Sequence, residues 1–201
     1  MTYQLLKFAH LMGAILMGAG LIGVWLADLR ARQLRELAPF YEAVRNIAVF
    51  YDGLVVPGAL LLVGSGTWII VMLYGWQFLQ VPWLMGMVVL FTFEFIEGNT
   101  ITRVYFVRLR RITRAALQKG SSFTPELVRA REKPIPTWTH FLDLPLYFLI
   151  VSLGVLRPDT WIHFNVGLVL AVAAATLLTI YLPRLYPWRP RLDAAVESPG
   201  T

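Results

Sequence analysis

The 201-residue sequence contains no cysteine, and only 15% of its residues are charged. Without cysteine the chain can form no disulfide, thiolate zinc site, iron–sulfur cluster or cysteine nucleophile. The low charge, set against 57% hydrophobic residues, excludes an ordinary water-soluble domain, which needs a polar surface. The serine elbow, the phosphate-binding glycine loop and the His-Glu-x-x-His helix of common enzyme classes are also missing. Any chemistry therefore depends on three histidines and on carboxylates within apolar segments.

Five continuous apolar segments are long enough to cross a bilayer, because about 20 helical residues span a hydrocarbon core of about 30 Å. They lie near residues 3–27, 47–73, 83–106, 138–156 and 161–182. The first is too long for a cleavable signal peptide. The sequence predicts an all-α integral membrane bundle of five transmembrane helices. These helices form one domain over residues 1–192, and a disordered tail follows over residues 193–201.

The distribution of basic residues predicts the orientation. Of the 18 lysines and arginines, 16 fall into the connections 28–46 and 103–133 and the C-terminal tail. Because basic loops stay in the cytoplasm, we expect an inner-membrane protein with its N-terminus outside and its C-terminus cytoplasmic. These connections are expected to meet anionic lipids rather than nucleic acid. Within the larger one, Thr124-Pro125-Glu126 predicts the start of a short amphipathic helix.

A histidine inside the first segment is the first candidate site. His10 lies roughly 10 Å below the outer end of this segment, and Gly13, Ala14 and Met17 follow on the same helix face. A nearly flat face and a neutral imidazole suit a haem plane with His10 as axial ligand. His163, near the outer start of the fifth segment, is the candidate second ligand. The alternatives are helix packing through the small residues and an interfacial anchor at His163.

Carboxylates within the apolar segments form the second candidate site. Glu94-x-x-Glu97 and His140-x-x-Asp143 each place two polar residues on one helix face, and Asp52 lies at a similar depth, roughly 9 Å from the basic connections. Such a cluster suits a divalent metal ion or a proton relay of coupled carboxyls. The alternative is a structural network that joins the helices.

The first segment also carries a resemblance to a known group. Residues 5–13 (LLKFAHLMG) and 18–20 (GAG) resemble the first helix of a clan of bacterial membrane proteins, among them CopD-type copper-resistance proteins and HemJ-type protoporphyrinogen oxidases. Within this clan the chain is most similar, over roughly four helices, to a family of predicted integral membrane proteins of unknown function. The resemblance implies a b-type haem held by His10, or copper handling there. Met17 departs from the clan's usual tryptophan, and the fifth helix and the Glu94/Glu97 pair are additions.

Taken together, these patterns predict a membrane protein that binds haem b through His10 for electron transfer or haem-linked redox chemistry. One alternative is a metal-ion or proton-coupled transporter or sensor that uses the carboxylates. Another is a non-catalytic accessory subunit, which would pack against a larger membrane complex, a redox partner or a second copy of the chain through its small-residue helix.

Overall fold

The computed structural model describes residues 1–120 and 122–188, and within them every regular element is a helix. In chain order the elements are α1 (Thr2–Gln33), α2 (Leu37–Phe50), η1 (Tyr51–Val55), α3 (Val56–Leu73), η2 (Gly75–Gln80), α4 (Pro82–Glu97), η3 (Gly98–Thr102), α5 (Arg103–Gln118), α6 (Pro125–Arg131), α7 (Pro134–Leu156) and α8 (Trp161–Leu185). The all-α prediction is confirmed for this part of the chain. The tail predicted over residues 193–201 lies outside the described residues.

Five helical runs are long and apolar enough to cross a membrane, as predicted. Two of them exceed what a span requires: α2, η1 and α3 form one run of 37 residues, and α4, η3 and α5 form another of 37. At 1.5 Å per residue each measures about 55 Å, against a hydrocarbon core of about 30 Å. Each run is therefore about 25 Å longer than the core is thick.

The two basic connections are largely helical instead of being loops. α1 continues to Gln33 and α2 begins at Leu37, so that only residues 34–36 turn the chain. α5 carries an apolar face, including Phe106 and Leu109, into the protein interior, and its arginines lie on the other side. The predicted start of a helix after residue 124 is confirmed, since the Thr124 side chain accepts a hydrogen bond from the Leu127 amide at 3.3 Å.

Both long runs contain a wide π-helical turn, η1 in one and η3 in the other. The amide of Val56 donates to the carbonyl of Tyr51, and the amide of Arg103 donates to that of Gly98, each five residues back. Pro57 contributes to the first turn, because it has no amide hydrogen to continue the ordinary helical pattern. Turns of this kind are frequent at functional sites.

α1 packs closely against α3 through glycines. A Cβ atom at Gly58 would lie 2.5 Å from the amide nitrogen of Met17, and one at Gly13 would lie 2.9 Å from the carbonyl oxygen of Gly58. α1 also contacts α7, where the Tyr147 hydroxyl donates to the carbonyl of Ala14. Close approach through small residues is the usual way in which helices associate within a membrane.

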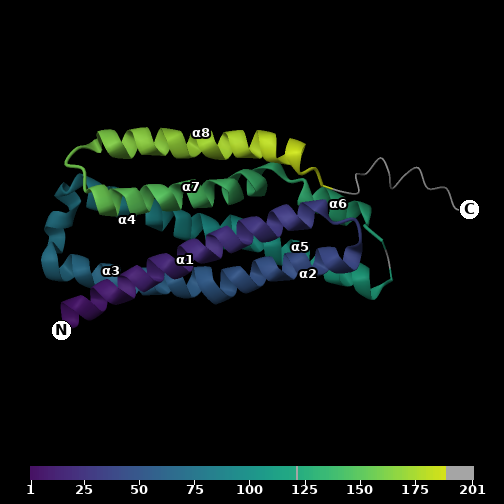
Figure 1. Ribbon diagram of the computed structural model, residues 1–201, viewed down its shortest axis with the longest axis horizontal. Coiled ribbons are helices and arrows are strands. Elements are labelled where there is room, and N and C mark those ends of the chain that lie inside the picture. The colour runs from purple at the N-terminus through teal and green to yellow at the C-terminus, as the bar shows by residue number, and fades with distance from the viewer. Residues whose placement is uncertain (121, 189–201) are drawn as a thin grey trace, which may run out of the picture.

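α7 lies between α4 and α8 (Figure 1), and it is the most deeply buried of the five spans. α8 is the most exposed, with one side packed on α7 and α4. The indole nitrogen of Trp138 in α7 donates to the Thr176 hydroxyl of α8 at 3.2 Å. α7 is therefore the element on which buried polar side chains of the bundle can meet.

The two ends of the bundle differ in chemistry. One end, here called the aromatic end, holds the N-terminus and η2 with its neighbours Tyr74 and Trp83. The other, here called the basic end, holds the end of α1, α5 and α6 (Figure 1). Trp188 packs at this end against Arg32 and Arg131. α2 and α5, which belong to the two long runs, also lie at the basic end.

Candidate functional site

Three of the predicted carboxylates come together between α4 and α7. Glu94 and Glu97 lie one turn apart on α4, Asp143 faces them from α7, and all three are buried. They are here called the carboxyl cluster. By helical rise from Pro82, Glu94 lies about 18 Å and Glu97 about 23 Å from the aromatic end of α4. The cluster thus occupies the half of the membrane nearer the basic end.

Hydrogen bonds connect the carboxyl cluster to two hydroxyl groups. The carboxyls of Asp143 and Glu97 lie close enough to interact directly. Glu97 Oε1 also accepts a bond from the Thr102 hydroxyl at 2.8 Å, and the Thr102 and Thr139 hydroxyls lie 3.3 Å apart. A series of polar groups therefore leads from the cluster toward the basic end: Asp143, Glu97, Thr102 and Thr139.

Glu94 has no such partner. Its side chain is buried, and within residues 1–120 and 122–188 neither of its carboxylate oxygens finds a hydrogen-bond donor. It lines a cavity of about 80 Å³ together with Tyr51 and Asp143. The hydroxyl of Tyr51 fits there only because residue 98 is glycine, since a Cβ atom at Gly98 would lie 2.7 Å from that oxygen.

Asp52 does not join the carboxyl cluster, although it lies at a similar depth. Its side chain is 53% exposed and forms an ion pair with Arg103 at 3.1 Å. Because η1 is a wide turn, its neighbour Tyr51 takes the inward position and Asp52 faces outward. The expectation that Asp52 joins the other carboxylates is therefore wrong, because its side chain faces outward.

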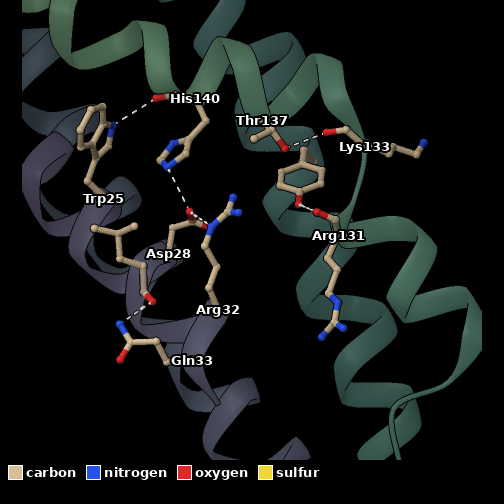
Figure 2. Close-up of polar contacts among 10 residues, drawn as sticks. Trp25, Asp28, Arg32, Gln33, Arg131, Lys133, Thr137 and His140 are labelled. Atoms are coloured by element: carbon tan, nitrogen blue, oxygen red, sulfur yellow. Dashed lines mark hydrogen bonds and ion pairs between the residues drawn. The ribbon is translucent and has the colours of Figure 1, made fainter. Parts of the chain in front are cut away.

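His140 is also separate from the cluster and lies beside Asp28. The Asp28 carboxylate binds Arg32 at 2.8 Å, and its same oxygen lies 3.8 Å from His140 Nε2 (Figure 2). Trp25 donates from its indole nitrogen to the His140 carbonyl at 3.2 Å. Asp28, Arg32 and His140 are here called the Asp28 network. Sequence reasoning missed it because Asp28 and Arg32 were assigned to a loop, although their i,i+4 spacing is that of a helical ion pair.

The basic end holds a second buried arginine. Trp188 contacts two guanidinium groups, with the Cζ atom of Arg32 at 4.3 Å and that of Arg131 at 5.5 Å from its ring centre. Burial lowers the pKa of Arg131 to about 10, so this side chain stays protonated at neutral pH. From the sequence, both arginines served only to predict the orientation of the protein in the membrane. In the structure they attach the chain at Trp188 to the end of the bundle.

A divalent metal ion does not suit this arrangement. Among the described residues, no three His, Asp or Glu side chains are grouped so that they could hold a metal ion. Two carboxyls buried this close together also favour sharing a proton, whereas metal ligands must be deprotonated. The geometry fits a proton site better than a metal site.

The two candidate haem ligands lie at different helix interfaces. His10 packs against α3, where its Nδ1 lies 3.1 Å from the Ser65 hydroxyl oxygen. That hydroxyl donates to the carbonyl of Leu61, so it accepts from His10 Nδ1–H and leaves Nε2 unprotonated. His163 is exposed and lines a groove of α7 and α8. The structure therefore does not bring the two imidazoles together.

The helix face beside His10 does not fit a porphyrin. Gly13 is covered by α3, with the carbonyl of Gly58 against it, and Met17 is buried in the core. Ala14 offers its carbonyl to Tyr147 of α7. The small residues predicted to leave space for a ring instead bring α1 into contact with two other helices. Haem binding by His10 stays a prediction that the packing does not favour.

The fold and the buried groups define the class of the protein: a helical integral membrane bundle with ionisable side chains inside it. The family model for predicted integral membrane proteins (DUF2269) matches residues 4–158, and the chain belongs to this family. The match covers α1 to α7, which agrees with the resemblance over four spans, and α8 lies outside it. No curated protein and no solved structure matches the chain.

Proposed function

We propose that the protein binds protons at the carboxyl cluster and exchanges them with the aqueous phase at the basic end, as part of a proton-coupled transporter or sensor. One observation carries the proposal: Glu94, Glu97 and Asp143 are buried close together inside a spanning segment, and carboxyls placed in this way favour holding a proton. Carboxyls this close titrate as a coupled group instead of independently. Burying them is costly, so their presence within a span points to function.

The hydroxyl groups beside the cluster support a route for the proton. Thr102 lies about 30 Å along the helix from Pro82, at the depth where the hydrocarbon core ends. Its hydroxyl contacts both Glu97 and Thr139. Hydroxyls both donate and accept, so this pair can pass a proton between the cluster and water.

Infrared spectroscopy of the protein in lipid nanodiscs tests this function. Protonated carboxyls absorb separately from carboxylates, and buried ones separately from exposed ones. We expect a buried, pH-sensitive carboxyl signal that changes in Glu97→Gln and Asp143→Asn. Asp52→Asn is the matched control, because this acid is exposed and paired with Arg103. A wild-type protein without such a signal would overturn the proposal.

The route has its own test. Thr102→Val keeps the size of the side chain and removes its hydroxyl. We expect the buried carboxyl signal to persist but its hydrogen–deuterium exchange to slow, because the connection to the basic end is broken. Thr100→Val is the control, since the Thr100 hydroxyl bonds only to backbone carbonyls of its own helix. Equal exchange rates in the two variants would exclude Thr102 from the route.

We also infer that the basic end faces the cytoplasm of an inner membrane, following the positive-inside rule. The absence of cysteine makes the test direct, because single-cysteine variants carry one label site each. Lys119→Cys and Gln77→Cys place a thiol at exposed positions of the basic and aromatic ends. A membrane-impermeant maleimide added outside cells should label the second and not the first. The reverse pattern would invert the orientation.

Contact with anionic lipids is proposed only for arginines near the membrane boundary. Arg103 lies near that boundary, whereas Arg111 on α5 lies about 12 Å farther along the helix. Electrostatic attraction to the lipid surface falls off within a Debye length of about 8 Å. We therefore expect Arg103→Gln to weaken the effect of anionic lipid more than Arg111→Gln does. A vesicle-binding or thermal-stability assay with and without anionic lipid measures this effect.

A further inference from the structure

A crevice leads from the side of the bundle to Glu94. It lies between α3 and α4, which pack against different partners: α3 on α1 and α4 on α7. Leu60 and Phe95 line it and are 60% and 43% exposed, whereas Glu94 at its base is only 5% exposed. The exposed side chains belong to membrane-spanning segments, so the crevice opens toward lipid.

The chemistry of the crevice is specific for a positive charge. Four groups near Glu94 interact with it electrostatically: the carboxyls of Glu97 and Asp143 and the hydroxyls of Tyr51 and Tyr147. The nearby cation Arg103 acts on Tyr51 and is paired with Asp52 at the surface. An anion would meet three carboxyls here, whereas a cation with N–H donors would find two unpartnered oxygens of Glu94.

Aromatic side chains in the walls of the crevice provide a second feature that favours a cation. Phe91 and Phe95, one turn apart on α4, both line the crevice, and their rings are stacked within 18° of parallel. Aromatic rings beside a carboxylate are a common way to hold an organic ammonium ion. A cavity of about 80 Å³ holds a small head group but not a drug-sized molecule, whose pockets measure about 300–1,000 Å³.

We propose that the crevice binds a small lipophilic ammonium ion, which enters from the lipid and displaces a proton from Glu94. The proposal rests on the proton site proposed above and names its second ligand. One positive charge enters as R–NH₃⁺ and pairs with the Glu94 carboxylate. One proton leaves Glu94 and passes through Asp143, Glu97 and Thr102 to the basic end. Charge is conserved, and the two cations compete for the same carboxylate.

The test uses octylammonium as probe, with octanol and octanoate as neutral and anionic controls of the same chain length. Binding to the full chain in nanodiscs is measured by titration calorimetry, and proton release by a pH-sensitive dye in weak buffer. We expect octylammonium alone to bind, to release protons, and to bind more weakly as the pH falls. In Glu94→Gln the affinity should drop about tenfold or more, because a charge-assisted hydrogen bond is lost.

Two variants guard against misreading that result. Glu42→Gln removes an exposed carboxylate at the basic end and should leave binding unchanged. Leu60→Trp places a bulky side chain at the exposed edge of the crevice and should also reduce binding, without touching the carboxyls, even if Glu94→Gln fails to fold. Unchanged binding in Leu60→Trp or in a folded Glu94→Gln would overturn the crevice as the site.

The remaining outcomes separate this inference from the proposed function. If octylammonium does not bind although the buried carboxyl signal is present, the ammonium site is overturned and the proton site stands. If octanol binds as tightly as octylammonium, the charge selectivity is overturned. If octylammonium binds without releasing a proton, the crevice stands as a cation site and the exchange is overturned.

Discussion

One carboxylate oxygen of Asp28 faces two basic side chains, with Arg32 Nε at 2.8 Å and His140 Nε2 at 3.8 Å. All three side chains are at most 2% exposed. Arg32 supplies the charge that allows Asp28 to stay ionised in the interior. The imidazole lies beyond hydrogen-bonding distance, and within the described residues neither of its nitrogens has a hydrogen-bond partner. The ion pair therefore depends on Arg32 and not on His140.

Replacing Arg32 should be strongly destabilising. Arg32→Met keeps an apolar stem over Trp188 but leaves the Asp28 charge buried without its cation. We expect the free energy of unfolding to fall by about 3–5 kcal/mol, the usual cost of breaking a buried pair. Denaturation in detergent, followed by circular dichroism, measures this loss. The double variant Asp28→Asn/Arg32→Met should recover part of it, because the unpaired charge is then absent.

The ion pair between Arg45 and Glu42 provides the matched control. It also joins neighbouring turns of a helix, at 3.3 Å, but both side chains are more than half exposed. Arg45→Met should cost at most about 1 kcal/mol, because exposed pairs contribute little. Equal losses in Arg32→Met and Arg45→Met would show that burial does not set the strength of the Asp28 pair.

The number and approximate bounds of the spans could be predicted from the sequence because apolar length is a one-dimensional signal. The continuation of α1 to Gln33 and of α4 into α5 could not, since their arginines resemble loop residues when only charge is counted. A helix that leaves the membrane is stabilised by packing of one face, and the partners of that face are known only from the fold.

The candidate site could also be predicted only in part, because the sequence shows the position of a residue along a helix but not the direction of its side chain. Depth along a helix follows from residue number, which correctly grouped Glu94, Glu97 and Asp143. The direction of a side chain depends on local helix geometry, and the wide turn η1 directs Asp52 outward. Contacts between helices are not encoded in spacing, so the position of His140 beside Asp28 was not predictable.

Loss of Trp188 should loosen the basic end. Trp188→Ala removes a ring that contacts Arg32, Arg131 and Phe40. We expect a loss of about 3–5 kcal/mol, as for other large buried aromatics. Trp188→Phe keeps an aromatic face, so it should lose less than half as much stability as Trp188→Ala. Denaturation in detergent measures both variants, and an unchanged stability of Trp188→Ala would contradict the contact with the two arginines.

The close contact between α1 and α3 predicts different effects for two glycines of α3. Gly58→Ala would place a Cβ atom 2.5 Å from the Met17 amide nitrogen, so the helices must separate. Such overpacking costs about 1–3 kcal/mol. Gly64 has nothing within 4 Å of an added Cβ atom, and Gly64→Ala should be neutral or stabilising by up to about 1 kcal/mol. Thermal unfolding in one detergent compares them, and equal effects would contradict the packing.

The close contact between α1 and α3 also predicts that haem does not bind beside His10. A porphyrin beside His10 needs the face of Gly13, which the carbonyl of Gly58 already covers. We therefore expect protein purified from haem-replete cells to show no Soret band, in either the oxidised or the dithionite-reduced state. A Soret band lost in His10→Ala would contradict this expectation, because it would require α1 and α3 to separate around a ring. His163→Ala serves as the control, since His163 lies at a different interface and its loss should leave any spectrum that depends on His10 unchanged.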